Sequence, residues 1–307
     1  MPLADRPEAE LPGCSAEQPL MEKIVPAVSS SVRGPSGIAH LPRMWLTAIA
    51  HARGQLADGY GPGGDMDQLL SDGLGIEPAS FAAFLNTVPT FSETETWVRA
   101  NAGRCDGAAI AAHNERIDVA RATVMRSDLT DWARIHAFLG SRRGTKLEPM
   151  VPLVSMDTAG PLGIKLLPRF WVKALIHEAG ALPDTWRSGE TRVVYTDGVP
   201  GTLATPGQGM DASTVANLAL DMNATIGYLH RDRPTYPEFE AWISANAGKL
   251  DPATVAAHNA GPAPVSGERP VAELTRMGYP GMSACGMYLY NDLADWDAVR
   301  EQLLKLG

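Results

Sequence analysis

Apolar residues recur at three- and four-residue steps through most of the chain, which is the spacing of amphipathic helices. The clearest case is a helix predicted from residue 41 to residue 52. Its apolar face comprises Leu41, Trp45, Ala48, Ile49 and Ala52. Pro42 is tolerated in a first helical turn, and Gly54 supplies a stop. The segment is therefore expected to pack one face against a core.

Helix-start signals divide the remainder into further short helices. Glu77 with Pro78 opens one helix, and the run Ser92-Glu93-Thr94-Glu95 has the spacing of a capping box. Asp106 and Asp251 are expected N-caps, the second followed by a first-turn proline. Alternation of apolar and polar residues is scarce outside residues 187–209. The fold class predicted is mainly α.

The helical pattern occurs twice. Residues 24–56 align with residues 150–182 at an offset of 126, and 16 of the 33 paired positions are identical. A fixed offset of this kind is the signature of an internal repeat. The chain is thus predicted to consist of two tandem homologous helical domains.

Beyond residue 182 the offset changes to 144, because the second copy carries 18 additional residues before Met210. In this insertion, 187–209, the run from Thr191 to Tyr195 precedes Asp197-Gly198, a turn signal. We expect a short β-hairpin or a loop there. Each copy then closes with a matching helix, DLTDW at residues 128–132 and DLADW at residues 292–296.

The polar and breaker-rich stretches supply the remaining boundaries. Residues 1–23 are expected to be a polar tail and residues 142–149 a linker. The first helical repeat then covers 24–141, and the second covers 150–307 with its insertion. Residues 261–283, rich in proline and glycine, are expected to form an irregular surface connection.

Composition narrows the function classes. The chain of 307 residues has a net charge of -9, which argues against nucleic-acid binding because clustered lysine and arginine are missing. No apolar run is long enough to span a bilayer, and the first residues lack the pattern of a signal peptide. A cytoplasmic protein is expected. The three cysteines are far apart and without metal spacing, so neither a disulfide framework nor a zinc site is predicted.

Three basic residues follow one another at four-residue steps on the helix predicted in the second copy. Arg169, Lys173 and His177 would form a row suited to an anionic group such as a carboxylate, phosphate or sulfate. His177 could also act as a general base. The alternative is a solvated basic face with acidic neighbours. His51, the counterpart of His177, is expected to be a partly buried core histidine.

Other candidates come from the loops and the aromatic residues. Asp65 follows a glycine-rich loop and could be a general base or bind a substrate amine, although a turn role is more common. Trp171, Trp186 and Tyr195 are assigned to substrate binding. The repeated arginines, Arg43 and Arg169, favour a fold role in which they pair with Asp67 and Asp211. His113 and His258 are expected to be structural.

Motifs for nucleotides, haem, flavin, pyridoxal phosphate or metals are missing, with neither a P-loop nor a dinucleotide fingerprint nor HExxH nor CxxC. If the protein is an enzyme, its reaction is expected to need no cofactor.

The ordered motifs LPRMW, Gly-x-Leu, Met-Asp-x-Leu-Leu, Leu-Gly-Ile, Ala-Ala-His-Asn and DLxDW resemble a bacterial family, domain of unknown function 5069. The match covers nearly the whole chain, once per copy, and implies a fold more than a reaction. The family's polar Asp-Lys-x-Arg run survives here only as Lys173. The tandem form also resembles the aziridine-forming proteins of azinomycin-type antibiotic pathways, which implies ring closure by intramolecular displacement.

Two hypotheses follow. The first is a cofactor-independent biosynthetic enzyme that uses His177 or Asp65 as the base on a small, anionic, amino-acid-like metabolite and expels an oxyanion such as sulfate. The second is a noncatalytic ligand-binding or partner protein on a duplicated scaffold, acting with another protein or as a homo-oligomer.

Overall fold

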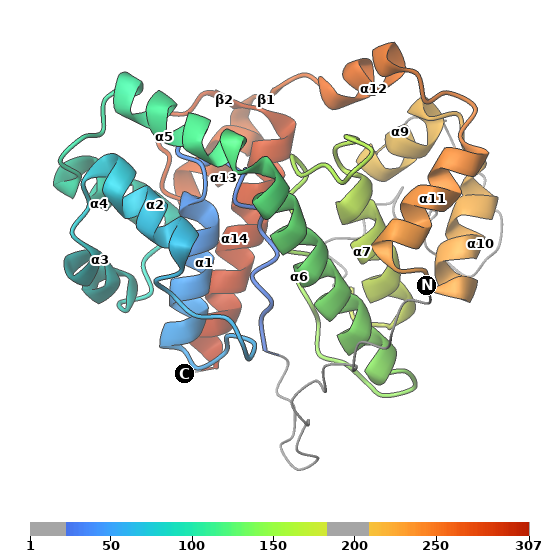
Figure 1. Cartoon of the computed structure of the whole chain (residues 1–307), viewed down its shortest axis with the longest axis horizontal. Coiled ribbons are helices and arrows are strands. Elements are labelled where there is room, and N and C mark those ends of the chain that lie inside the picture. Colours follow the sequence, from blue (N-terminus) through green and yellow to red (C-terminus); the bar gives the residue numbers. More distant parts are fainter. Residues whose placement is uncertain (1–22, 183–208, 307) are drawn as a thin grey trace, which may run out of the picture.

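A computed structural model describes residues 23–182 and 209–306, and it confirms that the fold is mainly helical (Figure 1). The helices whose residues precede the linker are α1 (Leu41–Ala52), α2 (Asp65–Leu74), α3 (Pro78–Leu85), α4 (Phe91–Asn101), α5 (Gly107–Val119) and α6 (Arg121–Ser141). Those after it are α7 (Leu167–Glu178), α9 (Met210–Asn217), α10 (Met222–Asp232), α11 (Tyr236–Asn246), α12 (Pro252–Asn259), α13 (Glu268–Arg276) and α14 (Met287–Lys305). We call residues 24–141 the first half and residues 150–306 the second half.

Helices α1 and α7 are the central helix of each half and are buried along most of their length. Each begins with a proline in the first turn, as the sequence predicts. Each is entered through a residue in the left-handed conformation, His40 at φ 69° and Leu166 at φ 66°. This conformation is costly for residues with a side chain. Because it occurs in both halves, it belongs to the scaffold.

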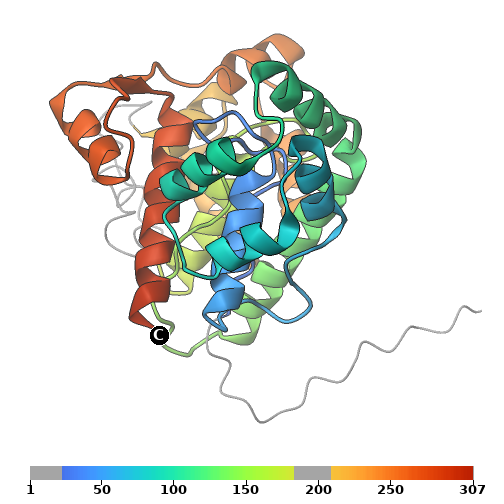
Figure 2. The same ribbon diagram turned by 90° about the vertical axis from the view of Figure 1, so that its left-hand side faces the viewer.

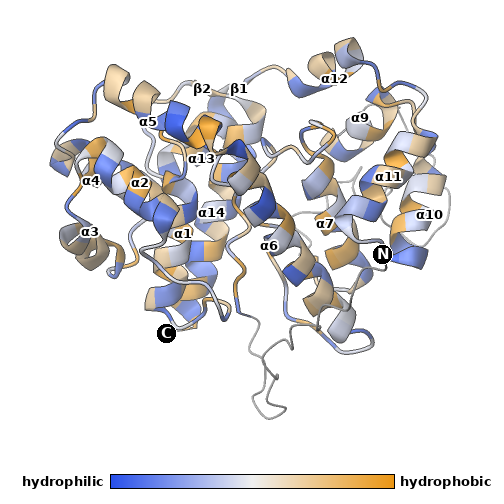
Figure 3. Cartoon of the chain, in the orientation of Figure 1, coloured by the Kyte–Doolittle hydropathy of each residue, from blue (hydrophilic) through white to orange (hydrophobic). Residues whose placement is uncertain are grey.

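Capping follows the sequence in most places. Asp106 and Asp251 cap α5 and α12 as predicted. The capping box of α4 was predicted two residues too late, because Thr90 is the cap and Glu93 its partner, whereas Ser92 lies inside the helix. The outer helices carry hydrophilic and hydrophobic residues side by side, as amphipathic helices do (Figure 3).

Residues 261–283 are more ordered than the sequence predicted. They contain α13 and strand β1 (Val265–Ser266), which pairs antiparallel with β2 (Ala284–Cys285). The predicted hairpin of the insertion, together with Trp186 and Tyr195, lies outside the described residues. The two short strands form the one sheet found in the described ranges.

The last helix of each half packs into the core of the other half. Helix α14 lies beside α1 and α4, and α6 lies beside α7 and α11 (Figures 1 and 2). Trp296 of α14 accordingly contacts Trp45 and Phe91, and Trp132 of α6 contacts Tyr236. Each hydrophobic core is therefore built from both halves, so the two cores do not separate at the linker.

Candidate functional site

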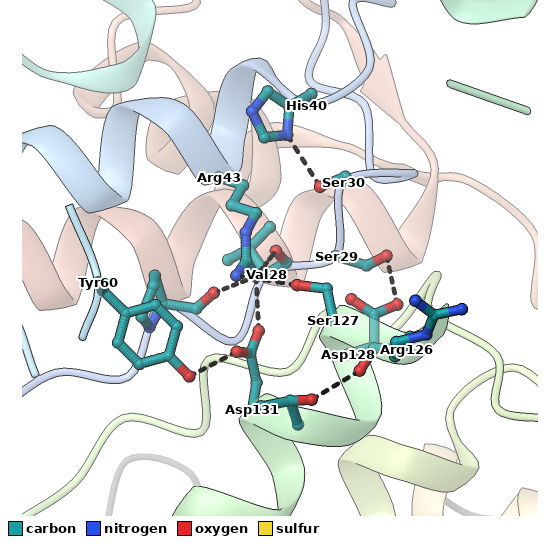
Figure 4. A network of polar contacts seen from close by, with 12 residues as sticks. Val28, Ser29, Ser30, His40, Arg43, Tyr60, Arg126, Ser127, Asp128 and Asp131 are labelled. Atoms are coloured by element: carbon teal, nitrogen blue, oxygen red, sulfur yellow. Dashed lines mark hydrogen bonds and ion pairs between the residues drawn. The ribbon is translucent and has the colours of Figure 1, made fainter. Parts of the chain in front are cut away.

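An arginine of the central helix organises the polar interior of the first half (Figure 4). Arg43 donates to the carbonyl oxygens of Pro26 and Val28 at 2.6 and 3.1 Å, and to Asp131 of α6 at 2.6 Å. The prediction that Arg43 pairs with Asp67 is wrong. Asp131 lies far away in the sequence, and only the packing of α6 beside α1 brings it to the guanidinium.

The second half repeats these contacts at the matching positions. Arg169 donates to the carbonyl oxygens of Pro152 and Val154 at 2.5 and 3.0 Å, and it pairs with Asp295 of α14 at 2.6 Å. Asp211, the predicted partner, is not used. Because the same contacts occur twice, the arginine–aspartate pair is a scaffold feature of this fold.

A second carboxylate lies one turn earlier on each of these helices. Asp128 accepts a hydrogen bond of 2.7 Å from Ser29, and Asp292 accepts one from Ser155. Burial raises the pKa of each carboxyl group to about 7, against the opposing effect of the serine and arginine donors. Each half thus holds a buried acid that titrates near neutral pH.

The first half adds groups that the second half lacks in its described residues. Tyr60 donates its hydroxyl to Asp131 at 2.6 Å, and Ser127 Oγ lies 3.3 Å from Arg43 (Figure 4). The exposed Arg134 places its guanidinium carbon 4.7 Å from the centre of the Tyr60 ring. The Arg43 side chain is 11% exposed, compared with 1% for Arg169. The first network therefore reaches the surface, at Tyr60 and Ser127.

A hydrogen-bonded chain of serine, histidine and aspartate lies next to this network. His40 bonds Ser30 Oγ through Nδ1 at 2.9 Å and Asp67 Oδ1 through Nε2 at 2.7 Å. The other oxygen of Asp67 accepts the backbone N–H of Gly63 in the glycine-rich loop at 2.7 Å. All three side chains are buried. The chain fixes the orientation of the imidazole and connects it to the loop before α2.

The matching positions of the second half cannot form this chain. Met156 and Leu166 replace the serine and the histidine, and Asp211 pairs with Lys173 at 2.5 Å instead. We define the first-half cluster as the polar side chains of Ser29, Ser30, His40, Arg43, Tyr60, Asp67, Ser127, Asp128 and Asp131. Ser29, Arg43, Asp128 and Asp131 have equivalents in the second half, whereas Ser30 and His40 do not.

The predicted basic row on α7 does not present a binding surface. Arg169 and Lys173 are buried, and each is bound to a carboxylate. The alternative reading, a basic face with acidic partners, fits these two residues better, although the pairs are buried instead of solvated. His177 is half-buried, and its ring is stacked on His230 at 5.7 Å. Trp171 is also buried and donates to the carbonyl oxygen of Pro234 at 2.8 Å.

The structure spreads the other candidates over the scaffold and the surface. His51 is exposed, so the prediction of a buried core histidine is wrong. Asp65 is the exposed first residue of α2 and is not one of the side chains of the first-half cluster. His113 and His258 bond the carbonyl oxygens of Ala39 and Lys165, which is the structural role expected.

Residues that recur between the two copies do not point to most of the first-half cluster. The useful signal was the opposite one, a change of chemistry between matched positions. Ser30 against Met156 and His40 against Leu166 are such changes, and both stand out in the alignment at offset 126. Tyr60 and Asp128 give no comparable signal, since their roles depend on the packing of α6.

A cavity of about 490 Å³ lies between the two halves. It is lined in part by the backbone segments around Pro26 and Pro152, whose carbonyl oxygens accept hydrogen bonds from Arg43 and Arg169. Its size is that of many small-molecule sites. The residues lining it are mostly apolar, and they include Val25, Ile135, Val151, Pro152, Val172, Ile176 and Val299.

Comparisons with known proteins found no matching family model, no matching curated protein and no matching solved structure. The resemblance to domain of unknown function 5069 therefore stays a prediction. Within the described ranges, no group of three histidine, cysteine or acidic side chains is arranged to hold a metal ion. In the same ranges, no helix is both long and apolar enough to cross a membrane.

Proposed function

We propose that the protein is a cofactor-independent enzyme of small-molecule biosynthesis and that its reaction takes place at the first-half cluster. The carrying observation is the difference between the halves. Among the described residues, the second half pairs Arg169 with Asp295 and Ser155 with Asp292, whereas the first half has the equivalent pairs and also Tyr60 and the His40 chain. Additional polar groups inside a protein need a reason, since burying them is unfavourable unless they are fully bonded.

The charges of the cluster favour a substrate with an amino group. Asp131 and Asp128 outnumber the single guanidinium of Arg43, and the pKa of Asp128 is raised by burial to about 7. A carboxylate with such a pKa accepts a proton from an ammonium group at neutral pH. The hydroxyl of Tyr60 donates to Asp131 at the position that a substrate N–H donor would take.

The anionic part of the substrate has a partner at the opening. Arg134 is exposed beside Tyr60, and it donates to the carbonyl oxygen of Asp58 at 2.7 Å while lying over the phenol ring. A guanidinium in this place binds a sulfate, phosphate or carboxylate group. A substrate that carries an amine and an oxyanion ester on neighbouring carbons would span the distance from Asp131 to Arg134.

The reaction we propose is an intramolecular displacement. A carboxylate of the cluster takes a proton from the substrate's ammonium group, the lone pair of the resulting amine forms a bond to the neighbouring carbon, and the carbon–oxygen bond breaks. The oxyanion leaves with the electron pair, as free sulfate or phosphate, and a three-membered ring is the organic product. Holding the amine and the leaving group in line is the contribution of the protein. The tandem resemblance noted in the sequence supports the same reaction class.

The test measures release of sulfate and loss of primary amine from a panel of vicinal amino sulfate and amino phosphate esters, starting with 2-aminoethyl sulfate. Asp131→Asn and Tyr60→Phe are expected to lower kcat by at least tenfold, because Asp131 is the carboxylate that would bind the amine and Tyr60 is the group at the opening that is bonded to it. The matched control is Asp295→Asn, which removes the same scaffold contact from the second half and leaves kcat per folded molecule unchanged. His177→Ala and Asp65→Ala are also expected to keep the rate.

Two outcomes would reject parts of this assignment. Loss of activity in His177→Ala, with full activity in Asp131→Asn, would return the site to the second half. Absence of any release across the panel would reject the displacement. The second candidate function is then a noncatalytic ligand-binding or partner protein, favoured by the recurrence of the arginine–aspartate pair in both halves.

A further inference from the structure

The cavity between the halves is separate from the first-half cluster, since none of the cluster's side chains lines it. Its walls come from matched positions of the two halves. Val25 faces it together with Val151, and Ile135 of α6 together with Val299 of α14. An occupant would therefore touch both exchanged helices at once. Nothing in the proposed displacement requires this space.

The interior and the opening of the cavity differ in polarity. Phe138, Ile176 and Leu303 are among the apolar side chains that line it. The charged residues that line it, Lys23, Glu148 and Lys305, are all exposed, so they mark its opening. Two of these residues are cations and one is a carboxylate.

The two lysines are not equivalent. Lys23 Nζ lies 2.6 Å from the carboxylate of Asp58, so its charge already has a partner. Lys305, in the last turn of α14, forms no ion pair within the part of the chain that the structure describes. Gln302 lies one turn before Lys305 and also lines the cavity.

We propose that this cavity binds a medium-chain carboxylate, with its hydrocarbon chain between the two halves and its head group at Lys305. The apolar walls favour the chain, since each buried methylene contributes about 0.8 kcal/mol in transfer from water, close to a fourfold gain in affinity. The exposed lysine favours a carboxylate over an alcohol of the same length. The proposal does not depend on the reaction proposed above.

The test is calorimetric titration of the full-length chain with hexanoate, octanoate and decanoate. One site per chain is expected, with affinity rising about fourfold per added methylene. Gln302→Phe should weaken decanoate binding at least tenfold by filling the space. Phe138 occupies the position of α6 that matches Gln302, so a phenyl group fits on this helix face. Gln302→Ala, the matched control, should bind decanoate within about twofold of wild type. Should Gln302→Phe fail to fold, Leu153→Trp fills the cavity from the opposite wall.

The head group is tested with Lys305→Ala and with decanol. The substitution should weaken decanoate about threefold, the size of an exposed ion pair, and should leave decanol unchanged. Equal affinity of wild type for decanol and decanoate would overturn the head-group assignment. Unchanged decanoate binding in both filling variants, or no saturable binding of any chain length, would overturn the site itself.

Discussion

Asp67 and Asp211 occupy matching positions in the two halves, yet each is paired with a basic residue from a different place. In the first half the partner is His40, which precedes α1, and in the second half it is Lys173, within α7. Leu166 stands in the second half at the position that matches His40, and Thr47 stands in the first half at the position that matches Lys173. A buried carboxylate needs a partner, but the fold accepts that partner from either side.

The same compensation occurs at a pair of buried glutamates. Glu240 accepts the hydroxyl of Tyr236 within α11 at 2.8 Å, whereas the matching pair in α4 is Glu95 with Phe91, which has no hydroxyl. Tyr279, which follows α13, donates to Glu95 at 3.0 Å instead. Each buried carboxylate thus has a partner in both halves, but the residue that supplies the partner differs. Exchanging these partner residues between the halves therefore tests the comparison directly.

The largest effect is expected from the tryptophans of the exchanged helices. Trp296→Ala and Trp132→Ala should each destabilise the protein by about 3–5 kcal/mol, as truncations of buried aromatic residues do. Hydrogen exchange locates the damage. Trp296→Ala should loosen α1 and α4, and Trp132→Ala should loosen α7 and α11. Loosening within the variant's own half alone would contradict the exchange.

Removal of the basic partner of a buried aspartate is expected to have the next largest effect on stability. Lys173→Met should lower the free energy of unfolding by about 3–5 kcal/mol, because it leaves the buried Asp211 without its lysine. The double variant Leu166→His with Lys173→Thr copies the residues of the first half and should recover part of this loss in urea denaturation. If the double variant is no more stable than Lys173→Thr alone, the two arrangements are not interchangeable.

The buried acids on α6 and α14 predict a pH dependence. The folded-state pKa of Asp128 and of Asp292 is raised to about 7, above the usual value, so folding takes up protons between about pH 4 and pH 7. The contribution that each protonated aspartate makes to folding stability is therefore fully present below about pH 4, and it is lost as the pH rises through 7. Relative to wild type, the free energy of unfolding of Asp128→Asn and of Asp292→Asn should each rise by about 2–3 kcal/mol on going from pH 5 to pH 8. A constant difference across the pH range would contradict the raised pKa values.

The smallest effect on stability is expected from removing the hydroxyl group that donates to the buried Glu95. Tyr279→Phe should cost about 1–2 kcal/mol by leaving Glu95 with one donor fewer. Phe91→Tyr places a hydroxyl where α11 has one, and in combination with Tyr279→Phe it should restore stability. Thermal unfolding of the two single variants and the double variant gives the coupling, and strict additivity would show that the two hydroxyls do not serve the same carboxylate.

The parts of the fold that depend on local pattern could be predicted from the sequence. The α1 and α7 helices, the caps at Asp106 and Asp251 and the mainly helical class follow from spacing and capping chemistry over a few residues. The partners of Arg43 and Arg169 could not be predicted, because Asp131 and Asp295 reach them through packing between distant helices. The row of basic residues on α7 shows the same limit, since helical spacing indicates which side chains share a face but not whether that face is buried.

The exchange of α6 and α14 also bears on the order of synthesis. The N-terminal core is closed by Trp296, Val299 and Leu303, residues that leave the ribosome only after those of α7 to α13. N-terminal domains usually fold while the rest of a chain is still being made. Here residues 24–141 alone lack the helix that covers α1, so they emerge with an apolar face exposed. The first core must therefore wait for α14, whereas the second core is closed by Trp132, Ile135 and Leu139 of α6, which is made earlier. Because each core contains a helix of the other half, the two halves are expected to fold and unfold as one cooperative unit.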